Sequence, residues 1–100
     1  MVKISVLYGQ PTDPDAFERH YAGTHRPLVD KIPNLQRFEA SRVVGTPDGG
    51  EPAYYRIAEL WFERQATLEA ALSSPEGQDT VADVPNFASG GAIILVSEVD

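Results

Sequence analysis

The sequence of 100 residues contains no cysteine. This absence excludes disulfides, thiolate metal sites and a cysteine nucleophile, and it is typical of proteins in a reducing compartment. The sequence also lacks any run near the ~20 apolar residues that a membrane span requires. Its first residues, MVKISVLYGQ, alternate like a strand and show no apolar stretch or cleavage site of a signal peptide. We therefore expect a cytoplasmic protein.

Positive charge is scarce and is missing from the last third of the chain. Lysine and arginine number 8 against 15 acidic residues, which gives a net charge of −7, and no basic residue follows Arg64. An acidic chain repels phosphate backbones and anionic lipids. We therefore expect neither nucleic acid nor a membrane surface as a partner.

The order of hydrophobic patterns predicts a single α+β domain over residues 1–100. Strands are predicted at 2–9, 35–45, 53–63 and 90–100, and helices at 13–32, 64–74 and 74–84. Asp13 and Ser74 precede prolines and are the expected N-caps. The order βαββαβ predicts a ferredoxin-like arrangement, with a four-stranded antiparallel sheet and the helices on one face.

The predicted sheet is apolar on both faces. Ala58 and Leu60 alternate with Tyr55, Ile57 and Trp61, and the last strand contains the run IILV. Helices cover only one face of a ferredoxin-like sheet, and an apolar face needs a cover. The simplest cover is a second copy of the chain, packed sheet to sheet with two-fold symmetry. We predict a homodimer, a dimeric α+β barrel.

Two residues that weaken helices interrupt the first long helical pattern. Pro27 cannot donate a hydrogen bond to the carbonyl of Gly23, and together these residues cost on the order of 4 kcal/mol in a helix interior. An interruption here would leave room for a small molecule between helix and sheet. At ~100° per residue, His25 lies on the flank of the apolar stripe and faces that space. His20 falls on the opposite flank, so the two histidines are not expected to share one face as metal ligands.

The same stretch, FERHYAGTHRPLVDKIPNL, resembles the motif of the EthD family, small proteins of the dimeric α+β barrel superfamily. The matching positions are Phe17, Tyr21, Thr24, His25, Pro27, Leu28, Lys31, Ile32, Pro33 and Leu35. Asn34 replaces a common glycine and also tolerates positive φ. The stretches YYRIAELWFE and SSPEGQDTVADVPNF resemble the family as well, so the resemblance covers nearly the whole chain.

The resemblance implies a ferredoxin-like protomer, a dimer and a pocket between helices and sheet. The superfamily includes cofactor-free monooxygenases, isomerases and polyketide cyclases or dehydratases, and the family is named for oxidative ether degradation. We predict that His25 is the catalytic acid/base, acting on a small hydrophobic, aromatic or ketide-like molecule. The predicted substrate-binding residues are Tyr21, Tyr55, Trp61 and Phe87. No cofactor and no metal is expected.

Alternatives stay open for the site residues and for the function. The alternative for His25 is a packed histidine that bonds backbone carbonyls, and tyrosines at such positions are more often core residues. The pocket could serve a non-catalytic carrier of an oxidative pathway, or the chain could be a structural dimer module. Glu59 is a charged residue among apolar neighbours on a strand in the middle of the predicted sheet. A buried charge needs a partner, and we expect Arg42 or Arg56 to pair with it.

Overall fold

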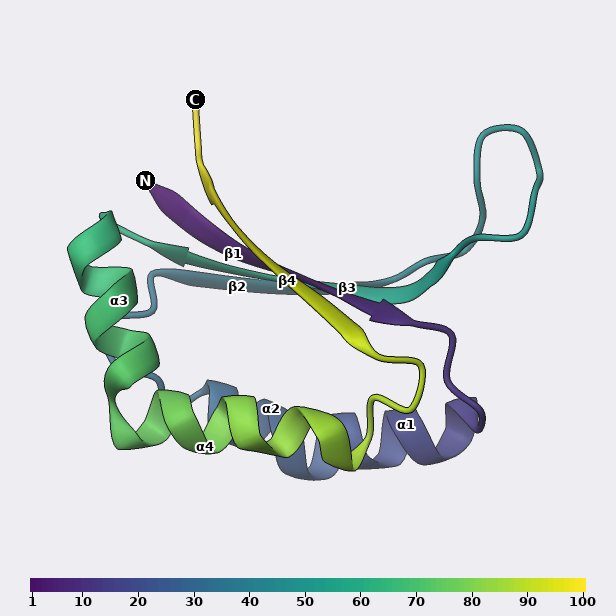
Figure 1. Ribbon diagram of the computed structural model, residues 1–100, viewed down its shortest axis with the longest axis horizontal. Helices are drawn as coiled ribbons and strands as arrows, with labels where there is room; N and C mark the ends of the chain where they lie inside the picture. Colours follow the sequence, from purple (N-terminus) through teal and green to yellow (C-terminus); the bar gives the residue numbers. More distant parts are fainter.

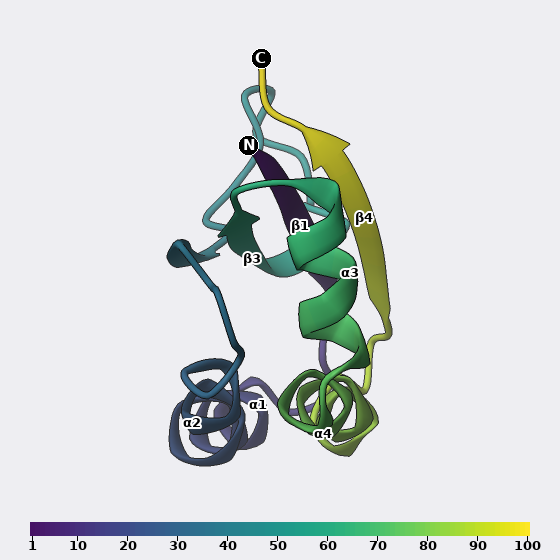
Figure 2. The same cartoon turned by 90° about the vertical axis from the view of Figure 1, so that its left-hand side faces the viewer.

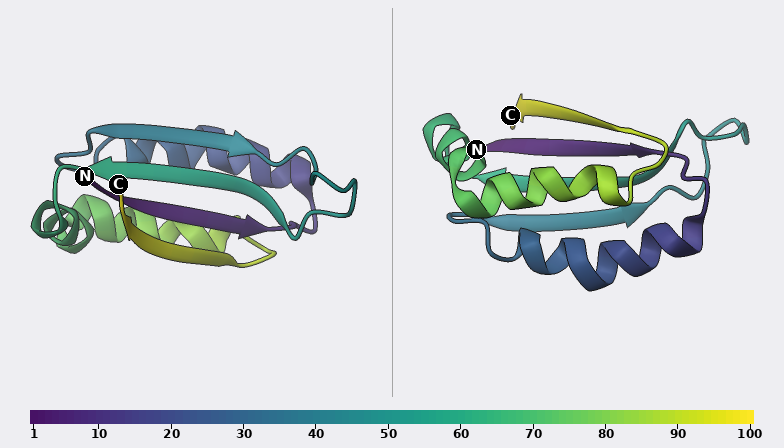
Figure 3. Two further views of the ribbon diagram at one scale, coloured as in Figure 1. Left: turned by 90° about the horizontal axis from the view of Figure 1, so that it is seen from above. Right: turned by 60° about the horizontal axis from the view of Figure 1, so that its bottom comes forward.

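The computed structural model describes residues 1–100 and contains one four-stranded antiparallel sheet with helices on a single face (Figure 1). The strands are β1 (Val2–Gly9), β2 (Arg37–Arg42), β3 (Tyr54–Phe62) and β4 (Ala92–Glu98). Their order across the sheet is β2-β3-β1-β4, as the view from above shows (Figure 3). The predicted ferredoxin-like α+β fold is confirmed.

Two helical segments lie side by side under the sheet (Figure 2). The first comprises α1 (Pro14–His20), a π-helix η1 (Tyr21–His25) and α2 (Arg26–Val29). The second comprises α3 (Gln65–Ser73), α4 (Pro75–Asp83) and a 3-10 turn η2 (Val84–Asn86). Within it α4 is the part that lies beside the first segment, while α3 stands upright at one end of the sheet (Figures 1 and 2). None of these helices has the length and apolar run needed to cross a bilayer.

The expected N-caps begin two of these helices. The side chain of Asp13 accepts a hydrogen bond from the amide of Ala16 at 3.2 Å, and that of Ser74 accepts one from Gly77 at 3.1 Å. Each cap satisfies an amide that the first helical turn leaves without a partner. The sequence signals therefore fix where α1 and α4 begin.

The core lies between the sheet and the helices. Every second residue of β1 is buried, because alternate side chains of a strand point to opposite faces. The members of this core are Val2, Ile4, Val6, Tyr8, Phe17, Tyr21, Val29, Ile32, Ala58, Leu60, Phe62, Leu68, Ala71 and Phe87.

A β-bulge changes the orientation of one predicted site residue. Gly9 pairs with Tyr54 and Tyr8 pairs with Arg56, so Tyr55 is an extra residue on β3. Its ring therefore turns to the helical side and packs edge-on against Phe17, with centroids 5.0 Å apart. The expectation that Tyr55 shares a face with Ile57 and Trp61 is wrong, since strict alternation fails at a bulge.

One half of the uncovered sheet face carries charge. Lys3 Nζ lies 3.4 Å from Glu59 Oε2, and the ring of Trp61 lies 5.4 Å from Lys3 Nζ and 4.8 Å from Arg37 Cζ. The partner of Glu59 is thus Lys3 on the neighbouring strand β1.

The expectation that Glu59 pairs with Arg42 or Arg56 is wrong. Regular alternation places Arg42 with Ala40, and Arg56 with Ala58, on the helical side, away from Glu59. There Arg56 Nε donates to Glu18 at 3.3 Å. The other half of the uncovered face is apolar, with Ile93 and Leu95 about half exposed.

The close approach of α3 and α4 generates a stability prediction. A β-carbon at Gly77 would lie 2.1 Å from the carbonyl oxygen of Ala71, so Gly77→Ala must push the helices apart. We expect a loss of about 1–3 kcal/mol in the free energy of unfolding, measured in urea, as for other overpacked sites. Gly23→Ala is the matched control, because nothing lies within 4 Å of its added β-carbon. Alanine's helix propensity should make that variant up to about 1 kcal/mol more stable. Equal effects at both positions would contradict this packing.

Candidate functional site

The predicted interruption of the first helix is a single π-turn. The amide of Arg26 donates to the carbonyl of Tyr21, five residues earlier, in place of the usual four. Pro27 has no amide proton to continue a regular α-helix here, and the hydrogen-bonded loop of the backbone gains one residue. The interruption expected at Gly23 and Pro27 is confirmed, and the structure shows its form.

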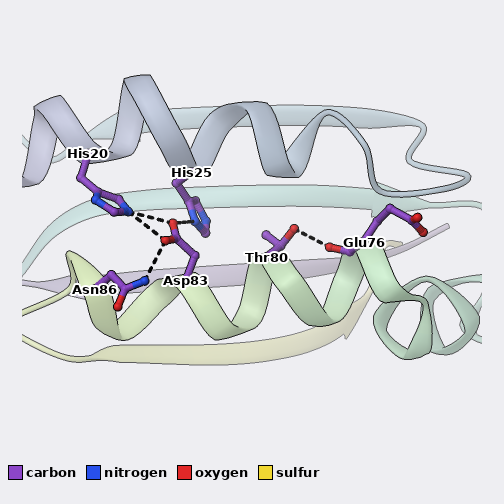
Figure 4. Close-up of polar contacts among 6 residues, drawn as sticks. All are labelled: His20, His25, Glu76, Thr80, Asp83 and Asn86. Atoms are coloured by element: carbon purple, nitrogen blue, oxygen red, sulfur yellow. Dashed lines mark hydrogen bonds and ion pairs between the residues drawn. The ribbon is translucent and has the colours of Figure 1, made fainter.

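The π-turn brings His20 and His25 to the same side of the helix (Figure 4). His20 Nε2 lies 2.9 Å and 3.0 Å from the two carboxylate oxygens of Asp83. His25 Nδ1 lies 3.0 Å from Asp83 Oδ2. The expectation that these histidines do not share a face is wrong, because it assumed α-helical spacing. No group of three or more His, Cys, Asp or Glu side chains is placed to hold a metal ion.

Asp83 is a site residue that was not predicted from the sequence. It ends α4, lies 58 residues from His25, and its carboxylate is buried and also accepts from Asn86 Nδ2 at 3.0 Å. A carboxylate at a helix C-terminus faces the negative end of the helix dipole, which disfavours it. That unfavourable position is a signal that Asp83 needs a partner elsewhere in the fold.

The surroundings of His25 and Asp83 shift the pKa values of both side chains. Burial lowers the pKa of His25 below its ordinary value of 6.5, more than the hydrogen bond to Asp83 raises it. Burial alone would raise the pKa of Asp83, but hydrogen bonds from Asn86, His20 and His25 outweigh burial and lower it. At neutral pH the pair is therefore a neutral imidazole beside a carboxylate.

An apolar cavity of about 60 Å³ lies between the helices and the sheet. Tyr21 and His25 line it, and nearly all its other walls are hydrophobic side chains. Val81 and Ile94 line the cavity and are each nearly half exposed, so it opens between α4 and β4. The cavity is far smaller than the ~300–1,000 Å³ typical of drug-sized ligands.

The structure brings together three of the five predicted site residues. The ring centroid of Phe87 lies 4.7 Å from that of His25, and Tyr21 stacks on His25 at 5.5 Å. Phe87 packs on His25 but does not line the cavity, and neither do Tyr55 and Trp61. Trp61 lies between Lys3 and Arg37 on the uncovered face.

Comparison with known proteins assigns the family. The protein-family model of the EthD domain matches residues 9–91 of the sequence. The chain belongs to the EthD family. It is 44% identical to an uncharacterized 11.0 kDa protein in the thcB-thcC intergenic region of Rhodococcus erythropolis, over 98% of this chain and 94% of that one. It is also 36% identical to a crystallised EthD family protein of Bacillus halodurans, covering 100% of this chain and 99% of that one, with a TM-score of 0.94.

More distant structures share the fold of this EthD protein. One is a dimeric ferredoxin-like protein of unknown function from Thermobifida fusca, with 15% identity, a TM-score of 0.71, and coverage of 98% of this chain and 90% of that one. Another is SnoaB from Streptomyces nogalater, a cofactor-independent oxygenase, with 14% identity, a TM-score of 0.70, and coverage of 98% and 91%.

The lowered pKa of His25 predicts that this EthD protein loses stability in mild acid. The unfolded chain binds a proton at His25 at higher pH than the folded chain does. The free energy of unfolding should therefore fall from about pH 7.5 to pH 5, towards the folded-state pKa. His25→Gln keeps a donor for Asp83 and removes this titration, so its stability should change less over that range. Urea unfolding at several pH values measures both slopes, and identical slopes would contradict the assignment.

Proposed function

We propose that the protein binds a small hydrophobic molecule in the cavity and that His25 moves a proton on it without a cofactor. The hydrogen bond between His25 and Asp83 carries this proposal. An ionised carboxylate only accepts hydrogen bonds, so the proton of a neutral His25 resides on Nδ1. Nε2 then keeps its lone pair and makes no hydrogen bond to the protein.

This arrangement suits a general base. The lowered pKa keeps the imidazole of His25 neutral and ready to accept a proton near neutral pH. When Nε2 accepts a proton, the carboxylate of Asp83 stabilises the resulting imidazolium, as in other histidine–aspartate pairs. Asp83 thus orients His25 and balances its charge, while Asn86 and His20 hold Asp83 in place.

The proposed chemistry starts with proton removal and is an isomerisation, a dehydration, or an oxygenation in which dioxygen is the oxidant and supplies the oxygen atom. The likeness to a cofactor-independent oxygenase supports chemistry of this kind on this fold. The alternative is a carrier of an oxidative degradation pathway that binds the same ligand without converting it. The almost wholly apolar cavity wall supports binding of a hydrophobic ligand, which is all that a carrier requires.

We further propose that the protein is a homodimer that pairs through the uncovered sheet face. Ile93 and Leu95 are exposed on that face at 45% and 53%, next to the charged half around Trp61. A contiguous exposed apolar surface favours association. The dimeric relative of the same fold supports this assembly.

A ligand screen tests the function. Purified protein is heated with a panel of small aromatic and ketide-like compounds, and compounds that bind the folded state raise the unfolding temperature. For an enzyme, His25→Gln should still be stabilised by the same compound but convert it ~10²–10⁴-fold more slowly. For a carrier, neither protein converts the compound. If no compound raises the unfolding temperature, the cavity is not a ligand site.

A charge placed on the uncovered face tests the dimer. Leu95→Lys should weaken association more than about tenfold, because two-fold symmetry buries two ammonium groups in one interface. Ala70→Lys adds the same charge at an exposed position of α3 and should leave the dimer intact. Light scattering at micromolar concentration measures the mass. A monomeric wild-type protein would contradict the proposed assembly.

A further inference from the structure

Two buried side-chain polar atoms lack a hydrogen-bond partner: the hydroxyl of Tyr21 and Nε of Arg26. Buried polar atoms are almost always paired, so each unpaired one needs an explanation. Both atoms belong to residues at the two ends of the same π-turn hydrogen bond. Arg26 Nε can only donate, and the Tyr21 hydroxyl can donate or accept, so an acceptor is the one kind of group that would satisfy either atom.

The protein provides a partial substitute for the missing acceptor at only one of the two atoms. The guanidinium of Arg26 lies over the ring of Phe38, with Cζ 4.5 Å from the centroid, and the aromatic face partly replaces an acceptor. Tyr21 has no such compensation for its hydroxyl. The residue is only 3% exposed, and its ring is packed among Tyr8, Phe17 and His25.

The charges around Tyr21 favour a partner with negative character. The guanidinium of Arg56 lies 4.8 Å from the Tyr21 ring centroid. Burial raises the pKa of Tyr21, the charges of Arg56 and Arg26 act in the opposite direction, and the carboxylate of Glu18 raises it further. The hydroxyl therefore stays protonated as a donor near neutral pH. Arg26 stabilises partial negative charge on an oxygen placed beside it, and Arg56 contributes less because it is paired with Glu18.

We propose that the hydroxyl of Tyr21 is an oxygen-binding subsite, and that the ligand of the cavity is a small apolar molecule with one acceptor oxygen, such as a ketone, enol or phenol. This inference rests on the proposed ligand cavity. Tyr21 and His25 line that cavity together, with ring centroids 5.5 Å apart. A ligand oxygen on Tyr21 would place the adjacent acidic hydrogen near Nε2 of His25.

The subsite also restricts the ligand class. A hydrocarbon of the same shape would fill the apolar cavity but leave the Tyr21 hydroxyl unpaired. A water molecule that occupies the subsite in the free protein would have to be replaced by a group that can accept the same hydrogen bond. Both effects favour an oxygen-bearing ligand over its hydrocarbon analogue.

Phenol and toluene are the matched probes, because they share a ring and differ at one substituent. Their affinities are measured by titrating each into ¹⁵N-labelled protein and following amide shifts of the cavity-lining residues Gly77 and Thr80. We expect the wild type to bind phenol about tenfold more tightly than toluene, the effect of one additional hydrogen bond. Tyr21→Phe should abolish most of this difference, and toluene affinity should not fall.

Tyr54→Phe is the control, because it removes a tyrosine hydroxyl outside the cavity and should preserve the preference for phenol. Tyr21→Phe should also unfold at the same or a higher temperature without ligand, since it deletes an unpaired buried group. A lower unfolding temperature would mean that the hydroxyl serves the fold, and would overturn the subsite.

The remaining outcomes separate the two proposals. If wild-type protein binds phenol and toluene equally, the oxygen subsite is wrong while the ligand cavity stands. If Tyr21→Phe keeps the preference for phenol, another group recognises the oxygen and the assignment to Tyr21 is wrong. If neither probe binds, the cavity is not a site for small apolar molecules, and both proposals fail.

Discussion

The carboxylate of Asp83 joins the two helical segments beneath the sheet. It accepts hydrogen bonds from His20 and His25 on the first segment and from Asn86 just after its own helix. A buried carboxylate without such partners would be strongly destabilising, and the helix dipole adds to its cost at the end of α4. The position of Asp83 therefore requires both histidines on one side of the first helix, and the π-turn provides this.

The π-turn also links the cluster of His20, His25 and Asp83 to the cavity. The residues that it contains include both Tyr21 and His25, the two polar groups that the first helix presents to an apolar wall. A regular α-helix would separate His20 from His25 around the helix axis, and only one of them could reach Asp83. Single π-turns inside α-helices occur often at functional sites. This one lies where a buried charged group meets a cavity.

Most of the fold could be predicted from the sequence, because its signals are local. The alternation in VKISVLYG, the caps at Asp13 and Ser74, and the order of strands and helices all depend on near neighbours in the chain. The predictions that failed depend on backbone irregularities. Tyr55 faces the helices because a bulge breaks the alternation, and His20 joins His25 because the helix widens. Asp83 was missed because its partners lie 58 and 63 residues away, and no periodicity reports such a contact.

The tautomer of His25 is the most direct test, because the general-base proposal depends on which ring nitrogen carries the proton. Long-range ¹H–¹⁵N correlation spectra of the imidazole, recorded near pH 7.5 without ligand, distinguish the two nitrogens. A protonated Nδ1 with an unprotonated Nε2 is the expected result, since Nδ1 donates to Asp83 at 3.0 Å. A proton on Nε2, or a fully charged imidazolium at that pH, would contradict the role of His25 as a base facing the cavity.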